Sequence, residues 1–200
     1  MERSTRRESF PGWGEWVIVE NGVFEMVVTY LEMLERPDRF RVPSPREGFS
    51  LRRIRAPSVP FYRELYRSVG EKWYWADRCK MDDEALRNII HDPRVEIHVL
   101  FADQRPAGYA ELDMRQSPDI ELTYLGIIPE CIGMGLGRFL LSNAIDLCWK
   151  RETRRLWLHT CSLDHPRALS FYEKAGFRIY RREVRMVHSR EFTAVGNGCG

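Results

Sequence analysis

The sequence lacks a run of apolar residues that approaches the roughly 18 residues of a membrane-spanning helix. It also lacks the apolar core, about 7–15 residues long, of a signal peptide, because its first residues, MERSTRRESFPGWGEW, are mostly charged and polar. Charge of one sign is missing as well, since 31 Lys and Arg balance 29 Asp and Glu. Binding that is driven by nucleic-acid phosphates needs a strong basic excess. We therefore expect a cytoplasmic protein with no membrane and no nucleic-acid partner.

Cysteine pairs at metal-binding spacing are absent too. The five cysteines are scattered, with no CxxC and no Cys/His cluster: Cys79, Cys131, Cys148, Cys161 and Cys199. We expect no metal site, and we expect reduced thiols. What the chain does have is apolar content, 44% hydrophobic and 12% aromatic residues, which excludes a disordered protein and suits a packed core.

The first quarter of the chain predicts a β-hairpin. Strand-forming residues at 16–19 and 23–30 flank Asn21-Gly22, which supplies the two positive-φ residues of a type I′ turn. A proline-rich, charged stretch follows and ends near residue 48. We predict three parts: an N-terminal extension with the hairpin (1–48), a main domain (49–190) and a flexible tail (191–200).

The main domain alternates between the two hydrophobic periods of strands and helices. The pattern predicts strands at 49–55, 95–102, 107–114, 120–128, 155–161 and 177–187, and helices at 58–69, 82–90, 136–150 and 166–175. This order predicts an α/β (α+β) fold, in which a mixed β-sheet is flanked by helices.

A glycine-rich loop joins the apolar strand 120–128 to the helix that follows it. Gly133, Gly135 and Gly137 let the backbone approach a ligand closely, and the new helix presents unpaired N–H groups. Such a loop binds anions, most often pyrophosphate, and Arg138 lies in the first helical turn. The loop has neither the Lys-Ser/Thr of a Walker A motif nor the GxGxxG of a dinucleotide fold. A tight turn with packing glycines is the alternative interpretation.

A second motif lies one strand and one helix downstream. Residues 127–141 read I-x-P-x-x-I-G-x-G-L-G-x-x-L-L, and residues 165–177 read H-x-x-A-x-x-x-Y-x-x-x-G-F. In this order and at this separation, the pair resembles the two motifs of the GNAT superfamily of acyl-CoA-dependent N-acyltransferases. The resemblance covers about residues 49–190. Ile132 stands where the family has Arg or Gln, and His165 stands where it has Asn.

The resemblance implies a centrally splayed sheet and transfer of an acetyl group from acetyl-CoA, the co-substrate, to a primary amine of a small molecule or protein. The amine would attack the thioester directly. The residues that the resemblance assigns to CoA binding are Leu125, Gly126, Ile127, Gly133, Met134, Gly135, Leu136, Gly137, Arg138, His165 and Ala168. Gly126 is expected to let the ligand lie close against its strand.

The chemistry also needs an acid for the leaving thiolate and a base for the amine. Tyr172 matches the family tyrosine and is our candidate acid. Glu121 is the candidate base and Glu111 is its rival, since the register between their strands is unknown. His159 and His165 are further alternatives for the base.

Two other kinds of function stay open. The departures from the family motifs at Ile132 and His165 are compatible with a non-catalytic acyl-CoA-binding or regulatory domain. The glycine-rich loop taken alone is compatible with a nucleotide-binding module. Trp73-Tyr74-Trp75 could wall an apolar or cationic acceptor site. The hairpin could pair with a second subunit in a homodimer. The acceptor itself is not identified by the sequence.

Overall fold

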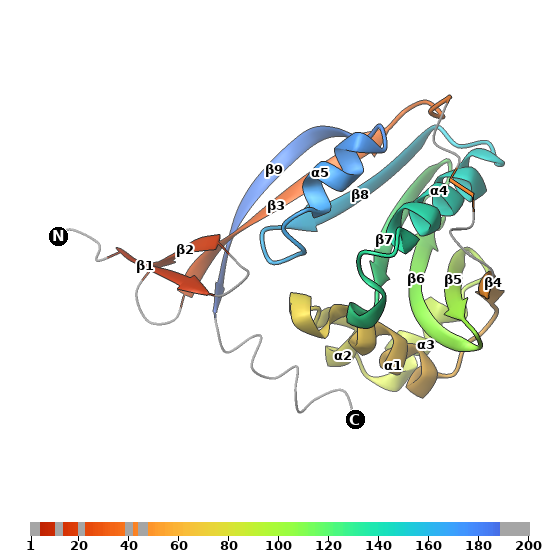
Figure 1. Ribbon diagram of the computed structural model, residues 1–200, viewed down its shortest axis with the longest axis horizontal. Coiled ribbons are helices and arrows are strands. Elements are labelled where there is room, and N and C mark those ends of the chain that lie inside the picture. The colour runs from red at the N-terminus through yellow and green to blue at the C-terminus, as the bar shows by residue number, and fades with distance from the viewer. Residues whose placement is uncertain (1–4, 11–13, 20–22, 39–41, 44–47, 189–200) are drawn as a thin grey trace.

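A computed structural model describes residues 5–10, 14–19, 23–38, 42–43 and 48–188 of the chain (Figure 1). Within these residues nine strands form one sheet in the order β1-β2-β3-β8-β7-β6-β5-β4, while β9 also pairs with β3. The strands are β1 (Thr5–Phe10), β2 (Gly14–Val19), β3 (Val23–Met33), β4 (Phe49–Ile54), β5 (Val95–Ala102), β6 (Arg105–Asp113), β7 (Asp119–Ile127), β8 (Arg155–Cys161) and β9 (Arg178–His188). The helices are α1 (Val59–Gly70), α2 (Asp77–Lys80), α3 (Asp83–Ile90), α4 (Leu136–Trp149) and α5 (Ala168–Lys174), with short 3-10 turns η1 (Glu71–Trp73) and η2 (Pro129–Cys131).

Side-chain caps set the start of two of these helices. The Ser58 side chain accepts a hydrogen bond from the Phe61 N–H at the start of α1, and Asp82 accepts one from the Ala85 N–H at the start of α3. The segment 72–78, whose aromatic sequence favours no single element, contains the end of η1 at Trp73 and the start of the short helix α2 at Asp77, and residues 74–76 belong to neither.

The helices pack on both faces of the sheet. On one, the α4 face, Leu140 of α4 belongs to a core that includes Leu156 of β8. On the other, the α1 face, Tyr66 of α1 and Leu86 of α3 belong to a core that includes Val99 of β5. The prediction of a mixed sheet flanked by helices is confirmed.

The sheet splits at its one parallel junction among the described strands. β7 and β8 pair over three positions only, Asp119–Arg155, Ile120–Leu156 and Glu121–Trp157. Beyond Glu121, β7 remains on β6 as far as Ile127, whereas β8 remains on β3 as far as Cys161, so the strands diverge (Figure 1). The centrally splayed sheet that the resemblance implied is therefore confirmed.

The predicted N-terminal hairpin is confirmed as β2 and β3, which pair antiparallel at Ile18–Phe24 and Val19–Val23, while Asn21-Gly22 lies outside the described residues. β1, which we did not predict, pairs with β2. β3 is also part of the main sheet, because it pairs with β8 through residues 28–33 and with β9 through residues 23–32. The boundary near residue 48 and the tail 191–200 stay predictions.

Candidate active site

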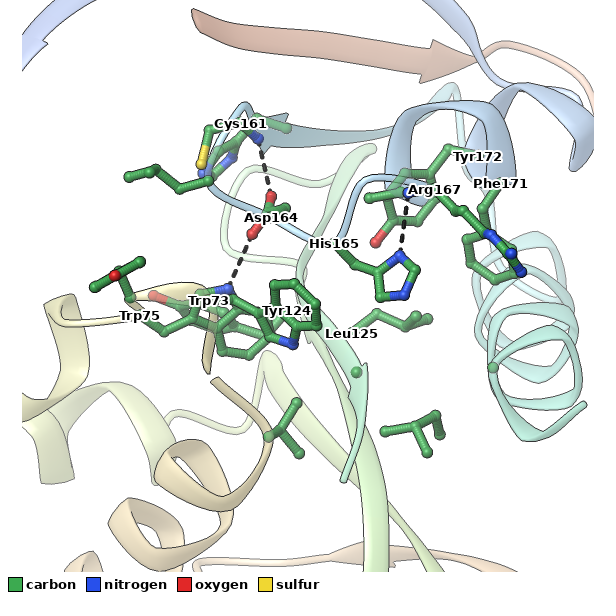
Figure 2. Close-up of a pocket in the computed structure, with 18 of the residues that line it drawn as sticks. Trp73, Trp75, Tyr124, Leu125, Cys161, Asp164, His165, Arg167, Phe171 and Tyr172 are labelled. Carbon is green, nitrogen blue, oxygen red and sulfur yellow. Dashed lines mark hydrogen bonds between the residues drawn. The ribbon is translucent and has the colours of Figure 1, made fainter. Parts of the chain in front are cut away.

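The split between β7 and β8 contains a cavity of about 800 Å³ (Figure 2). Its walls come from the second half of β7, the glycine loop, β8, α5 and the aromatic segment that follows α1. Ten of the eleven residues that we expected at a CoA site line it, and the exception is Met134, whose side chain is exposed. The candidate bases Glu121 and Glu111 are not on its wall.

The glycine loop enters α4 in a conformation that favours glycine. Gly133 has φ +90° and Gly135 has φ +78°, and a Cβ on either would meet no atom within 4 Å. Gly135 caps α4 without a side-chain hydrogen bond, so the N–H groups of residues 136–138 have no capping side chain. An open, uncapped helix start next to Arg138 suits a pyrophosphate.

The end of β7 presents its peptide groups to the cavity at alternate residues. The Ile128 N–H donates to the Ala107 carbonyl of β6 at 3.0 Å. In an antiparallel ladder alternate residues point their N–H and C=O groups to opposite sides. The peptide groups of Leu125 and Ile127 therefore point away from β6, toward the space that β8 vacates.

Position 126 requires glycine for a different geometric reason from the one we expected. A Cβ built on it would lie 2.2 Å from Cγ1 of Val69 in α1 and 3.5 Å from Cη2 of Trp75. The missing side chain makes room for α1, not for a ligand, and the alternation along β7 turns the peptide groups of Gly126 toward β6.

Tyr172 projects from α5 toward the cavity (Figure 2). Its side chain is almost entirely buried. Burial, with a contribution from the negative charge of Asp164, raises the pKa of its phenol above the usual value. The group therefore stays protonated at neutral pH and is available as a proton donor.

The loop after β8 contacts the aromatic segment after α1 across the cavity (Figure 2). Asp164 accepts hydrogen bonds from Trp75 Nε1 at 3.1 Å, from Thr160 Oγ1 at 2.7 Å and from the Cys161 N–H at 2.9 Å. The Trp73 ring lies 5.0 Å from the His165 ring. Asp164 is a site residue that we did not predict, because the contact that joins it to the far wall comes from Trp75, which is distant in the sequence.

His165 is held as a neutral donor. Its Nδ1 accepts the Arg167 N–H at 3.1 Å, and burial together with the charge of Arg167 lowers the pKa of its imidazole. A neutral ring that accepts at Nδ1 carries its proton on Nε2. His165 can thus offer an N–H, as the family asparagine would.

Glu111 is enclosed under α1 and does not reach the cavity. It is fully buried and accepts hydrogen bonds from the Tyr62 hydroxyl and from Arg78 Nη2, the latter at 2.5 Å. Burial raises the pKa of this carboxyl, although Arg78 and Tyr62 oppose the rise. Glu111 is therefore a buried ion-pair partner of Arg78, and it is not positioned to meet an amine as the rival base would have to be.

Glu121 reaches the cavity only through a neighbour. The register that the sequence left open places it opposite Asp113 on β6 and Trp157 on β8. Its Oε1 lies 3.4 Å from Nδ1 of His159, and His159 does line the cavity. Asp113 is engaged by the Arg115 guanidinium.

Cys131 and Cys161 also line the cavity, and both are free thiols, as is Cys148. Burial raises the pKa of the Cys161 thiol to about 12, and burial with nearby Glu130 raises that of Cys131. Neither is a thiolate at neutral pH, which argues against an acyl-carrying cysteine. The expectation of reduced thiols is wrong at Cys79, which is disulfide-bonded.

Residues 60–177 match the family model described as acetyltransferase (GNAT) family, and the chain belongs to this family. A candidate ribosomal protein bS18-alanine N-acetyltransferase of Bacillus subtilis is 30% identical over 48% of the chain and 62% of its own length. An uncharacterized N-acetyltransferase of Mycobacterium bovis is 32% identical over 45% of the chain and 57% of its own length. The alignments thus span about three fifths of these curated relatives.

Solved structures share the fold at low sequence identity. A GCN5-related N-acetyltransferase from Sphaerobacter thermophilus superposes with a TM-score of 0.57 at 16% identity, over 84% of this chain and 53% of its own. An aminoglycoside acetyltransferase from an uncultured soil sample gives a TM-score of 0.53 at 14% identity, over 64% of this chain and 87% of its own.

The described residues hold no group of three or more His, Cys, Asp or Glu side chains arranged to bind a metal ion. In the same part of the chain, every helix is too short or too polar to span a bilayer.

Proposed function

We propose that the protein is an N-acetyltransferase that moves the acetyl group of acetyl-CoA to a primary amine by direct attack on the thioester. The observation that supports this most is the position of one cavity between diverging strands, with an open, uncapped helix start on its wall and a protonated tyrosine beside it. Cytoplasmic location and a homodimer remain predictions.

In this proposal the N–H groups of residues 136–138 and the side chain of Arg138 bind the CoA pyrophosphate. The peptide groups of Leu125 and Ile127 bind the amide-containing pantetheine arm and the thioester carbonyl. Donors placed on a developing oxyanion are worth about 10²–10³ in rate. Tyr172 then gives its proton to the thiolate as the carbon–sulfur bond breaks.

The departure at Ile132 is consistent with this binding mode. Its side chain is 45% exposed at the rim of the loop, whereas the conformation at Gly133 and Gly135 that directs the backbone toward the ligand is intact. Backbone N–H groups then supply the contacts to phosphate, and we expect the missing Arg or Gln to weaken CoA binding without abolishing it.

Release of free CoA thiol from acetyl-CoA, followed over a panel of amines, tests the proposal. The names of similar proteins suggest two members of the panel, a peptide with an N-terminal alanine and an aminoglycoside. Turnover with at least one amine, and its loss in Gly135→Val, would support it. The Val side chain is strained at φ +78° and fills the open start of α4.

The alternative, a non-catalytic acyl-CoA-binding domain, predicts a different result from the same material. Calorimetric titration would then detect CoA binding, while no amine in the panel would release thiol. Failure of CoA to bind, with binding of a nucleotide instead, would overturn both readings.

A further inference from the structure

His159 lines the cavity from the opposite face of the sheet to Tyr172. Along β8 the buried residues Leu156 and Leu158 pack on the α4 face of the sheet. Because alternate side chains of a strand point to opposite faces, His159 points to the α1 face. Tyr172 belongs to the core on the α4 face. The two titratable side chains therefore meet one cavity from its two sides, as an acid on the thiolate and a base on the incoming amine would.

We propose that His159 accepts the proton that leaves the acceptor amine, and that Glu121 positions His159. The inference rests on the proposed function. Glu121 Oε1 lies 3.4 Å from Nδ1 of His159, and their side chains are 21% and 45% exposed. A neutral imidazole whose Nδ1–H faces the carboxylate has its lone pair on Nε2, which is the atom that accepts the proton.

The other charged groups near His159 come from strands β3 and β9. The Tyr30 ring lies 5.9 Å from the His159 ring. The Tyr30 hydroxyl donates to Glu183 and accepts from Arg185, and Arg181 lies over the Tyr30 ring. Glu183 is thus held by the Tyr30 hydroxyl and by its arginine neighbours. Glu121 is the carboxylate in contact with His159.

The carboxylates on the cavity wall are less suited to this task. Asp164 is occupied by three hydrogen-bond donors. Asp77, in the first turn of α2, is the other carboxylate of the described residues that lines the cavity. An imidazole, with an ordinary pKa near 6.5, is better matched than a carboxyl near 4 to an amine near 10.

The protons balance in this scheme. An acceptor that arrives as an ammonium ion loses one proton through His159 to solvent and becomes the neutral nucleophile. Its nitrogen then bonds to the thioester carbon, and the second nitrogen proton passes to His159. The carbon–sulfur bond breaks, Tyr172 protonates the thiolate, and the proton on His159 is returned to the tyrosine through solvent.

The pH dependence of kcat/KM for the acceptor tests the inference. We expect the wild-type rate to fall with slope one on the acid side, through the pKa of His159. In His159→Gln that limb should disappear, and the rate at pH 7 should fall about 10²-fold. The remaining rate should rise with pH, because the amine then loses its proton without a base. His91→Asn is the control, since His91 contacts the Pro57 carbonyl outside the cavity.

Glu121→Gln separates positioning from direct catalysis. Loss of the carboxylate destabilises the imidazolium, so we expect the acid limb, and the His159 pKa followed by imidazole NMR, to move to lower pH with a smaller loss of rate. Glu32→Gln is a matched control, because Glu32 is 22% exposed and lies 3.4 Å from Arg155 across the neighbouring pair of strands, β3 and β8. It should leave both unchanged.

Failure of this inference differs from failure of the proposed function. A wild-type protein that acetylates no amine contradicts the proposed function. If the wild-type protein turns over, and His159→Gln keeps the full rate and an unchanged acid limb, the role of His159 is overturned. A limb that vanishes in Glu121→Gln while His159→Gln retains it would make Glu121 the base itself. Unchanged CoA affinity in each variant verifies that the fold is intact.

Discussion

At the scale of single residues, two glycines of the site are glycines for opposite reasons. Gly135 adopts φ +78° beside open space, so its constraint is the backbone conformation. Gly126 lies in an extended strand, and its constraint is the 2.2 Å that would separate a Cβ from Val69. The first shapes a binding surface, and the second fixes how closely α1 approaches β7.

Gly126→Ala should therefore lower the free energy of unfolding by about 1–3 kcal/mol, the usual cost of overpacking a core. Urea denaturation measures this. Combining it with Val69→Ala, which removes the clashing methyl groups, should cost less than the sum of the two single changes. Gly137→Ala is the control, since a Cβ there has only ordinary contacts at 3.8 Å and 3.9 Å. Simple additivity of the two changes would contradict the steric explanation.

Tyr172→Phe removes the proton donor and keeps the buried ring. We expect kcat to fall about 10²-fold or more while the KM for acetyl-CoA changes little, because a general acid acts in the transition state. Steady-state kinetics with a good acceptor would measure it. Tyr180→Phe, on β9 and off the cavity wall, should retain the wild-type rate. A fully active Tyr172→Phe would remove the acid from the mechanism.

At the scale of elements, Glu96 of β5 connects three parts of the molecule. Arg53 of β4 and Arg151 after α4 each contact its Oε1 at 2.7 Å, and His98 contacts its Oε2 at 2.9 Å. Burial would raise the pKa of this carboxyl, but the hydrogen bond to His98 and the two guanidinium charges lower it below its usual value. The ionised form therefore stabilises the fold.

This lowered pKa predicts how stability depends on pH. Because the pKa is lower in the folded than in the unfolded chain, the contribution of Glu96 is complete above the ordinary value of 4.5. It is lost as the pH falls through the folded pKa. Glu96→Gln should be less stable at pH 7 and should lose less stability on acidification than wild type. Urea denaturation at a series of pH values checks this, with Glu64→Gln in an exposed pair as control.

At the scale of the whole molecule, periodicity and the two motifs predicted most strands and helices and the position of the cleft. They did not predict β1, because its sequence TRRESF is mostly charged and polar. Nor did they predict the position of β3 between β8 and β9, since pairing between strands distant in sequence leaves no local signal. The candidate base was open for the same reason. Glu111 meets Arg78 only through the packing of α2, and only the register of β7 and β8 shows that Glu121 meets His159.

The split of the sheet has a consequence for cooperativity. Three residue pairs join the two halves along β7 and β8, and the peptide groups of Leu125 and Ile127 point into the gap. A ligand arm with amide groups would act there as an inserted strand and couple the opening of the two half-sheets. We expect CoA to slow amide hydrogen exchange at residues 122–128 and 158–161 together. Protection of one half alone would mean that the ligand binds to a wall without bridging the sheet.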